Sequence, residues 1–554
     1  MIDAGDEVDL VVVGSGGGGL AAALTAAAAG RKVLVIEKLA TLGGSTAISG
    51  GALWIPNTSL MRAAGLHDSY EDAWTYLDTL IGEVSLATSP ARKKTYIDVG
   101  PQMVDFLLAQ DIQLCVCKDY PDYYAGHPGG RSSGRSIESA AFDGKKLGAD
   151  FARLTKRDLM PTIAIRASEL AGASNGLRTW DAIRTSLGVA WRTLLNMLTG
   201  GRTLTMGMAL AGQLILALQR NGVEMRTDTS LLRLLNDDHG KVIGVVLRDK
   251  NGERSIHVRD GVLLATGGFS RNAQMRFEHM PLSSADWSHS SRGDEGDGIR
   301  AGVAVGAAVA QMDEAWWMPT SLLPDGTRHM CSFERNKPHS IMVDASGERF
   351  CNEAASYMEV GQKIFQRQQE HGGAIPCWMI MDARHRRYYP FATWLAGKTP
   401  QSAIDAGYII RAATLDELAS RCKINAAGLA KTVARFNCMC AAGKDDDFQR
   451  GDDPYDRYYG DARVKPNPNL GTIEQAPFYA VAFYPGDIGT NGGLLTDEHA
   501  RVLREDGSPI AGLYATGNCT ASVMGRVYPG AGGTIGPAMV FGYVGAMHAS
   551  NLNK

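Results

Sequence analysis

The chain has 554 residues, of which 45% are hydrophobic and 21% charged, a composition typical of a large globular protein. Its 56 Lys and Arg stand against 59 Asp and Glu, a formal net charge of −3, so no basic excess is available to neutralise the phosphates of a nucleic acid. The nine cysteines show no CxxC and no zinc-type spacing with histidine, so we expect reduced thiols and no metal site.

The N-terminal sequence and the hydropathy indicate where the protein works. The first ten residues include several acids and no Lys or Arg, unlike a secretory signal. No segment has the roughly 18 uninterrupted apolar residues of a membrane span; the nearest, residues 206–218, is broken by two glycines and a glutamine. We therefore expect a cytoplasmic protein. Residues 150–220 have a helical pattern rich in Leu, Arg and Met, with Trp180 and Trp191, and suit either a cap or a lipid-facing surface at the inner face of the membrane.

A dinucleotide-binding pattern occupies residues 9–37. An apolar strand over residues 9–13 leads into a glycine-rich turn, an Ala- and Leu-rich helix to Gly30, and a second strand over residues 32–36 that ends at Glu37. In this setting the first glycine makes the tight turn, the second admits a pyrophosphate and the third lets the helix pack closely. The helix N-terminus attracts the diphosphate, and Glu37 can accept both hydroxyls of an adenosine ribose. The predicted contacts are Gly14, Gly16, Gly18, Gly19, Glu37 and Lys38.

Two later segments suit the same cofactor. Residues 42–56, LGGSTAISGGALWIP, form a long Gly, Ser and Thr stretch whose amides can wrap a second phosphate and the edge of a flavin ring. Strands are predicted over residues 223–226, 231–235, 242–247 and 253–258, and they lead to a buried strand that ends in Ala-Thr-Gly-Gly. The predicted contacts in these segments are Gly44, Ser45, Thr46, Ser49, Gly50, Gly51, Ala265, Thr266 and Gly267.

The C-terminal region repeats the strand and glycine theme. Residues 510–518 read as a strand running into a glycine, and residues 530–537 open a last helix that reaches about Ser550. The sequence therefore predicts an α/β fold: a Rossmann-like FAD-binding domain built from residues 1–313 and 488–554, with an inserted α+β catalytic or capping domain at 314–487 that contains a helix over 414–442. Asp297 and Asn518 suit either flavin contacts or helix N-caps, and Thr534 and Ile535 are further predicted contacts.

These motifs resemble the flavoproteins of the fumarate reductase and succinate dehydrogenase superfamily. Within it, the tail motif YPGAGGTIGP at residues 528–537 is most similar to the 3-ketosteroid Δ1-dehydrogenase family, and the resemblance extends over nearly the whole chain. It implies noncovalent FAD, because the position of the histidine that links flavin in other members is Gly44. In fumarate reductases GxRFxNExxxR supplies a proton-donating arginine; here GERFCNE at residues 347–353 is present, but that arginine is Tyr357.

The resemblance also implies a role for each catalytic residue. Tyr357 matches the base that removes the C2 proton of a 3-oxosteroid, and Tyr528 with the backbone N–H of Gly532 matches the pair that holds the C3 carbonyl, while the C1 hydride passes to flavin N5. An assisting tyrosine corresponds to Tyr123 or Tyr124, which the sequence does not separate. A phenol with an ordinary pKa near 10 needs either a lowered pKa or a neighbour that takes the proton onward.

The sequence thus predicts an FAD-dependent 3-oxosteroid 1,2-desaturase that acts on a 3-oxo-4-ene steroid and passes electrons to a quinone or another acceptor. One alternative is a related flavin dehydrogenase for another steroid or cyclic ketone, for example one carrying out Δ4-(5α) desaturation, against which the Tyr528-Pro-Gly sequence argues. Another is a flavin-binding subunit that only relays electrons. Trp316 and Trp317 suit either a sterol cavity or the filling of a domain interface.

Overall fold

The computed structural model describes residues 7–157, 163–198 and 200–551. Its larger sheet has at its centre β1 (Glu7–Val13), which pairs in parallel with β2 (Val33–Ile36) and with the C-terminal half of β11 (Gly252–Leu264). Six of the seven residues of β1 are buried, as expected for a parallel strand covered on both faces. The sheet is extended in parallel by β8 (Glu224–Arg226) and β21 (Pro509–Ala515), and antiparallel by β9 (Ser230–Asn236), β10 (Val242–Asp249) and β20 (Arg501–Leu503). This is the predicted Rossmann-like core, and β11 joins two segments that the sequence treated as separate strands.

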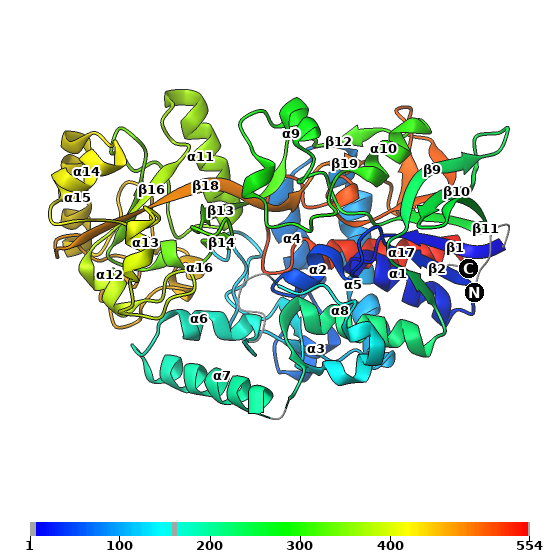
Figure 1. The fold of residues 1–554 in the computed structure, drawn as a ribbon, viewed down its shortest axis with the longest axis horizontal. Coiled ribbons are helices and arrows are strands. Elements are labelled where there is room, and N and C mark those ends of the chain that lie inside the picture. The colour runs from blue at the N-terminus through cyan, green and yellow to red at the C-terminus, as the bar shows by residue number, and fades with distance from the viewer. Residues whose placement is uncertain (1–6, 158–162, 199, 552–554) are drawn as a thin grey trace.

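Helices from both chain ends pack on this sheet. α1 (Gly17–Ala28) lies against α17 (Ile535–Ala549), and both termini of the described chain lie at the same end of the molecule (Figure 1). The contact is close because glycines meet there: a Cβ on Gly542 would lie 2.3 Å from the carbonyl oxygen of Gly18. α8 (Met206–Arg220) and α5 (Pro90–Ala109) flank this pair. The C-terminal helix thus completes the cofactor domain that the N-terminus begins.

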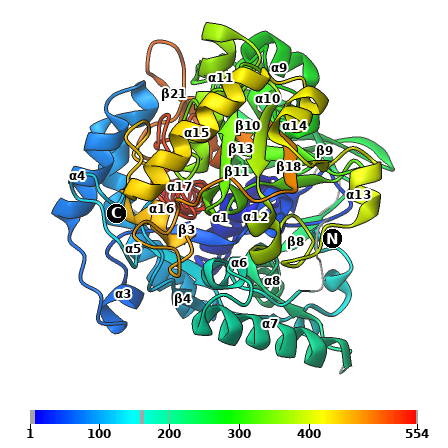
Figure 2. The ribbon, with the colours of Figure 1, turned by 90° about the vertical axis from the view of Figure 1, so that its left-hand side faces the viewer.

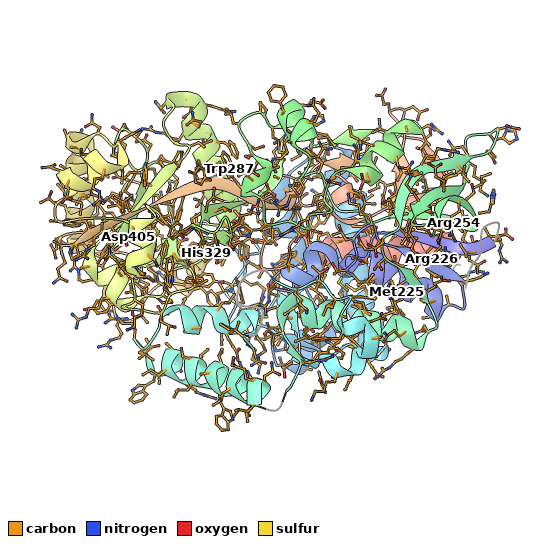
Figure 3. The ribbon with its side chains drawn as sticks, in the orientation of Figure 1. Met225, Arg226, Arg254, Trp287, His329 and Asp405 are labelled. Carbon is orange, nitrogen blue, oxygen red and sulfur yellow. The ribbon has the colours of Figure 1, made fainter. Side chains whose placement is uncertain are left out.

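A second sheet forms the other half of the molecule, on the left in Figure 1. Its strands are β13 (Ala315–Leu322), β14 (Arg328–Met330), β15 (Ser340–Val343), β16 (Cys377–Met381), β17 (Ile410–Ala412) and β18 (Phe478–Thr490). β18 pairs with β13, β16 and β17, and it runs from this sheet toward the cofactor domain. Trp287, labelled in Figure 3, packs on Tyr484 of β18 with ring centroids 5.1 Å apart.

Helices surround the second sheet. They are α11 (Tyr357–His371), α12 (Ala383–Tyr388), α13 (Gln401–Asp405), α14 (Leu415–Cys422), α15 (Ala426–Ala442) and α16 (Pro454–Tyr458). The single helix predicted over 414–442 is wrong, because the chain breaks at Lys423, which has a φ of +57°. Asn425 then caps a new helix by accepting a hydrogen bond from the Gly428 amide (2.9 Å).

A third, smaller sheet consists of β3 (Ala52–Trp54), β5 (Ser136–Ser139) and β4 (Leu114–Val116). α3 (Ser59–Ala63) lies toward the lower side of the molecule in Figure 1 and α4 (Tyr70–Ile81) toward its upper side, and both lie on the left in Figure 2. The hairpin of α6 (Leu170–Ser174) and α7 (Trp180–Leu198) runs along the lower edge of the molecule. The smaller pairs are β6 (Phe142–Asp143) with β7 (Thr203–Leu204) and β12 (Val309–Ala310) with β19 (Gly493–Leu494). α9 (Ala273–His279) and α10 (Asp297–Ala304) follow β11. Within the described ranges, no helix is both long and apolar enough to cross a bilayer.

Candidate active site

The glycine turn between β1 and α1 has the geometry of a dinucleotide site. Gly14 has a φ of +106°, and a Cβ there would lie 2.3 Å from the Ala265 carbonyl oxygen. A Cβ on Gly19 would lie 2.2 Å from the carbonyl oxygen of Gly14, so only glycine lets the helix come this near the strand. Gly16 differs, because a Cβ there would meet only Thr46 Oγ1, at 3.9 Å. The backbone at Gly16 is therefore accessible to a phosphate, whereas the other two glycines serve packing.

Glu37 lies at the C-terminal end of β2, as predicted. Its carboxylate accepts hydrogen bonds from the Ser15 hydroxyl (2.7 Å), the Ser15 amide (3.1 Å) and the Leu39 amide (3.0 Å). The same Ser15 hydroxyl accepts from the Gly43 amide at 3.0 Å. Because a carboxylate offers about four acceptor positions, Glu37 keeps capacity for a ribose hydroxyl. The strand end, the glycine turn and the second loop are thereby joined in one hydrogen-bonded unit.

The predicted loop over residues 42–56 is more ordered than its composition indicated. It contains a short helix, α2 (Gly44–Ile48), followed by β3. Thr46 Oγ1 accepts a hydrogen bond from the Gly17 amide (2.9 Å), which brings the second loop onto the N-terminus of α1. Ser45 Oγ accepts from the Ser291 amide (2.8 Å) and donates to Asp294 (3.2 Å). Burial raises the pKa of Asp294 to about 7, and no sequence pattern had singled out this carboxyl.

The remaining members of this loop line the same region. Ser49 Oγ accepts from the Gly51 amide (3.0 Å) and donates to the Thr46 carbonyl (2.7 Å). A Cβ on Gly50 would meet nothing within 4 Å, whereas Gly51 packs against the Met206 backbone, with its built Cβ only 2.3 Å from the Met206 carbonyl carbon. Gly50 therefore faces open space, and Gly51 serves packing against α8.

Lys38 and Asp297 meet each other. The Lys38 ammonium lies 2.6 Å from both Asp297 and Glu295, and Arg300 also lies 2.6 Å from Asp297. The N-cap alternative for Asp297 is wrong, because Gly296 caps α10 and Asp297 is its first residue. The N-cap alternative for Asn518 is wrong as well, since that residue lies inside a short 3-10 helix over Gly517–Cys519.

Other predicted contacts cluster at the start of α17. Asn518 Oδ1 accepts from the indole of Trp316 (3.1 Å), and both residues line a small cavity with Thr534, Pro537 and Ala538. Thr266, at the end of β11, accepts from the Gly298 amide through Oγ1 at 3.2 Å. A Cβ on Gly18 would be 2.6 Å from the Ala538 carbonyl oxygen, and one on Gly17 would be 3.5 Å from Ile535. These contacts run from the nucleotide turn to the N-terminus of the C-terminal helix.

Three of the predicted tyrosines converge at that end. The Tyr357 ring lies 4.9 Å from the Tyr528 ring and 5.3 Å from the Tyr123 ring, and the Tyr123 and Tyr528 rings are 5.5 Å apart. All three are buried, and Trp316 closes the group edge-on to Tyr528 at 5.4 Å. Tyr357 starts α11, Tyr528 follows β21, and Tyr123 precedes β5, so three distant segments supply one site.

Backbone contacts fix the tail motif beside this group. The Tyr123 amide donates to the Pro529 carbonyl (2.9 Å), and the Tyr76 hydroxyl donates to the same oxygen (2.6 Å). Ser136 Oγ donates to the Ala531 carbonyl at 2.9 Å. Gly532 has a φ of +100°, and a Cβ there would lie 2.5 Å from the backbone of Ala52 and Leu53, so no other residue fits without displacement of β3.

Tyr123 and Tyr124 occupy different surroundings. Tyr123 packs with Tyr357 and Tyr528, whereas the Tyr124 ring lies edge-on to His127 at 5.6 Å, and the Tyr124 amide donates to the Tyr76 hydroxyl (3.3 Å). Burial raises the pKa of Tyr124, and the nearby Glu359 carboxylate adds to that shift. The geometry therefore selects Tyr123 as the neighbour of Tyr357.

Sequence reasoning missed an extension of the aromatic group. Tyr455 packs on Tyr123 at 4.3 Å, and the hydroxyls of Tyr120 and Tyr459 lie 2.7 Å apart. Tyr455 and Tyr459 belong to the segment PYDRYYG, in which three tyrosines fall within five residues. That local density was the signal available, although nothing in the segment showed that it would fold against residues 120–124.

The ionisation of the phenols follows from their burial. Burial raises the pKa of Tyr357 well above its ordinary value of 10.0, and the Tyr123 and Tyr528 phenols add to the shift. Burial raises the pKa of Tyr528 less, because hydrogen bonds from Thr534, Tyr357 and the backbone of Gly532 favour its ionised form. Burial also raises the pKa of Tyr123. Without a ligand, these phenols are therefore protonated at neutral pH, and a lowered pKa of Tyr357 is not found.

A buried arginine holds the segment before Tyr357. Arg335 Nη1 donates to the Ala355 carbonyl (2.6 Å) and to the Glu353 carbonyl, and Asn336 Nδ2 donates to the Ala354 carbonyl (2.9 Å). Three consecutive carbonyls are thus held just before α11 begins. This network holds the segment that leads into α11, whose first residue is Tyr357.

The donor set fits FAD. A diphosphate can approach the open backbone at Gly16 and Gly50, beside the loop that Thr46 ties to α1. A ribose can bind at Glu37, at the end of β2. No group of three or more His, Cys, Asp or Glu side chains among the described residues is arranged to bind a metal ion. Fold and site together define a two-domain, FAD-dependent flavoprotein with a tyrosine-lined site.

Comparison with known proteins agrees with this class. A family model described as the FAD binding domain matches residues 9–535. The chain is 42% identical to 3-oxosteroid 1-dehydrogenase of Mycobacterium tuberculosis strain H37Rv, over 98% of each chain. It is 37% identical to 4-oxocyclohexanecarboxylate 2-dehydrogenase of Sinomonas cyclohexanicum, over 97% of this chain and 92% of that one. The crystal structure of 3-ketosteroid Δ1-dehydrogenase from Sterolibacterium denitrificans with 1,4-androstadiene-3,17-dione superposes with a TM-score of 0.93 at 38% identity, over 99% of this chain and all of that one. The chain belongs to the 3-oxosteroid 1-dehydrogenase family of FAD-dependent oxidoreductases.

Proposed function

We propose that this enzyme removes hydrogen from C1 and C2 of a 3-oxo-4-ene steroid, with Tyr357 as the base and Tyr528 and Gly532 as the carbonyl donors. The observation that carries the proposal is the convergence of three buried phenols, one of which, Tyr528, belongs to the same tail motif as Gly532. Support also comes from the relatives, which are named for 3-oxosteroids and for a cyclic ketone acid.

The ketone oxygen is the group that Tyr528 and Gly532 recognise. A C–H next to a ketone becomes acidic when the developing enolate oxygen meets fixed donors. The backbone of Gly532 limits the rise in the pKa of Tyr528, which indicates that the two groups are close, so a ketone oxygen beside them can receive a hydrogen bond from each. Each such donor is worth about 2.7–4 kcal/mol of barrier in related sites.

Proton removal falls to Tyr357 together with Tyr123. Because Tyr357 is protonated in the free enzyme, its own proton must leave as the C2 proton arrives. The adjacent Tyr123 accepts this proton at Oη as it releases its own hydroxyl proton toward the Tyr120 and Tyr459 hydroxyls, which already share a hydrogen bond of 2.7 Å, and one proton leaves the far end of this chain of phenols to water. FAD, when bound, supplies the acceptor for the C1 hydride. The residue at the flavin-linking position of other members is Gly44, so we propose that FAD is held noncovalently.

The chain also divides, in our proposal, into an FAD-binding part at residues 1–313 and 488–554 and a catalytic part at 314–487. The second sheet begins at Ala315, and its strand β18 crosses into the cofactor domain near Asp487. Asp487 lies 2.6 Å from Arg276 and accepts from Ser288 (2.6 Å), both of the cofactor domain. We propose further that electrons pass to a quinone or another acceptor and that the enzyme works in the cytoplasm, at the inner face of the membrane.

Anaerobic stopped-flow absorbance of the flavin tests the proposed reaction. Androst-4-ene-3,17-dione should reduce the flavin, and so bleach its absorbance, within the time course of the stopped-flow measurement. The product recovered should be 1,4-androstadiene-3,17-dione. Bleaching by 4-oxocyclohexanecarboxylate alone would identify a cyclic ketone acid as the substrate. Oxidation at C4–C5 of a 5α-steroid would identify the Δ4-(5α) reaction, and no response to any ketone would leave only the electron-relay alternative.

A further inference from the structure

Arg92 brings a positive charge into the interior of the cofactor domain. The residue lies in the first turn of α5 and is only 2% exposed. Its Nη1 donates to the carbonyls of Ala87 (2.8 Å) and Ala521 (3.2 Å), while its Nε has no hydrogen-bond partner. The guanidinium carbon lies 4.5 Å from the centroid of the Phe541 ring. Among the residues that the structure describes, no carboxylate forms an ion pair with this guanidinium.

A buried cation of this kind is costly to keep. Burial lowers the pKa of Arg92 to about 10, and the carboxylates of Asp497 and Glu498 oppose that shift without pairing with the side chain. Arg92 nevertheless stays charged at neutral pH. The two backbone carbonyls satisfy donors of the guanidinium but do not neutralise its charge. A charge that a protein buries without a counter-ion points to an anionic group that the site is built to meet.

Arg92 lines the cavity at the start of α17. This cavity of about 20 Å³ has room for one water molecule, and its walls include Trp316, Asn518, Thr520 and Thr534. Asn518 and Thr534 are two of the predicted cofactor contacts. α5 and α17 pack against each other near the centre of the molecule (Figure 1). The N-terminus of α17, a helix of 15 residues, directs the positive end of its dipole to the same place.

The flavin is the group in this region whose charge changes during turnover. The C1 hydride brings two electrons and one proton to the oxidised, neutral ring, so the reduced ring carries one negative charge, centred on N1 and the C2 carbonyl, unless it binds another proton. A nearby cation therefore stabilises the reduced ring more than the oxidised one. Charge near this part of the ring is one of the means by which a protein tunes a flavin.

We propose that Arg92, together with the N-terminus of α17, lies beside the N1 and C2 carbonyl end of the flavin ring and raises the reduction potential of the cofactor. The residue acts on the steroid reaction only through the flavin, because a higher potential favours acceptance of the C1 hydride. The inference rests on the proposed position of the flavin ring at the start of α17. It does not depend on the steroid chemistry, since the potential is measured without steroid.

Redox titration of the purified holoenzyme at pH 7, with a reference dye and no steroid, tests this role. The variants R92M and R92Q remove the charge, and R92Q retains a side-chain donor, whereas R92K keeps a cation. In R92M and R92Q the equilibrium constant for flavin reduction should fall at least tenfold, which makes the potential of this two-electron couple about 30 mV more negative. In R92K it should change less than threefold. If R92M does not fold, R92Q and R92K still decide the question.

Arg386 of α12 provides a matched control. It is also 2% exposed, donates to two backbone carbonyls, those of Tyr389 (3.1 Å) and Lys398 (2.9 Å), and has an Nε without a partner. Its guanidinium carbon lies 5.2 Å from the centroid of the Phe391 ring, but it does not line the cavity at α17. R386M should therefore keep the native potential.

Three results would overturn the proposal. A native potential in R92Q would show that the flavin does not sense the charge. An equal shift in R92K and R92Q would assign the effect to the shape or the hydrogen bonds of the arginine. An equal shift in R386M would assign it to the loss of any buried cation. Each of these outcomes leaves the proposed steroid oxidation intact, because that reaction is measured separately by flavin bleaching with androst-4-ene-3,17-dione.

Discussion

Replacing Tyr357 with phenylalanine removes the proposed base and leaves its ring in place. The ring contacts with Tyr123 (5.3 Å) and Tyr528 (4.9 Å) do not involve the hydroxyl, so no cavity forms. The stability cost is one hydrogen bond, about 0.5–1.5 kcal/mol. A positioned base contributes about 10²- to 10⁴-fold to the rate, or roughly 2.7–5.4 kcal/mol of barrier. Because Tyr357 is only 7% exposed, bulk water cannot easily take over, and we expect a loss near the upper end of this range.

The assay separates proton transfer from binding. Anaerobic flavin reduction by androst-4-ene-3,17-dione should slow by 10³-fold or more in Tyr357→Phe, while FAD content and steroid affinity change little. Exchange of the steroid C2 hydrogen with deuterated water, followed by NMR, should disappear as well. A variant that retains near-native reduction, or that loses reduction while C2 exchange continues, would refute the assignment of Tyr357 as the base.

Three further outcomes are expected from single substitutions. Tyr528→Phe should weaken both steroid binding and rate, with kcat/KM down by about 10²- to 10³-fold, because one of the two proposed carbonyl donors is lost. An unchanged kcat/KM would show that the ketone is held elsewhere. Tyr123→Phe should slow flavin reduction at least tenfold and Tyr124→Phe less than threefold, because the Tyr123 ring packs against Tyr357 whereas the Tyr124 ring packs against His127. Equal effects of the two substitutions in rapid-mixing experiments would contradict the proposed proton path. Asp456 is a buried carboxyl in the segment PYDRYYG, and it accepts hydrogen bonds from Asn352 Nδ2 and the Gly451 amide, both at 2.8 Å. Asp456→Asn should become progressively more stable, relative to the native protein, as pH rises from about 4 to 7. Burial raises the pKa of Asp456 from 3.8 to about 7, so between these pH values the folded state binds a proton that the unfolded state releases. The free energy of unfolding of the native protein therefore falls by up to about 1.4 kcal/mol per pH unit as pH rises. Chemical unfolding of both proteins at several pH values measures the difference, and a difference in unfolding free energy that does not change with pH would contradict the burial of a protonated Asp456.

The nucleotide half of the fold was predictable because local rules determine it. The strand, glycine turn, helix and terminal Glu37 each follow from short-range spacing, and the structure has them within two or three residues of the predicted bounds. The break at Lys423 was not predictable in this way, since Asn425 restarts a helix whose apolar spacing continues almost unchanged. Motif matching located Tyr357 and Tyr528, but only the three-dimensional fold separates Tyr123 from Tyr124.

The residues that sequence reasoning missed act through long-range contacts. Tyr455 and Tyr459 lie more than 300 residues from Tyr123, and Arg335 holds Tyr357 through backbone carbonyls that no side-chain pattern marks. Asp294 is distinguished by burial and by Ser45, a partner some 250 positions earlier. Such positions depend on contacts between segments far apart in the sequence, which local periodicity does not encode.

A crystal structure of the holoenzyme with 1,4-androstadiene-3,17-dione tests the central claim most directly. The account predicts the C3 oxygen within hydrogen-bonding distance of both Tyr528 Oη and the Gly532 amide, with C2 facing the Tyr357 hydroxyl. A steroid whose A ring points away from Gly532, or whose C2 lies nearer to another side chain, would contradict it.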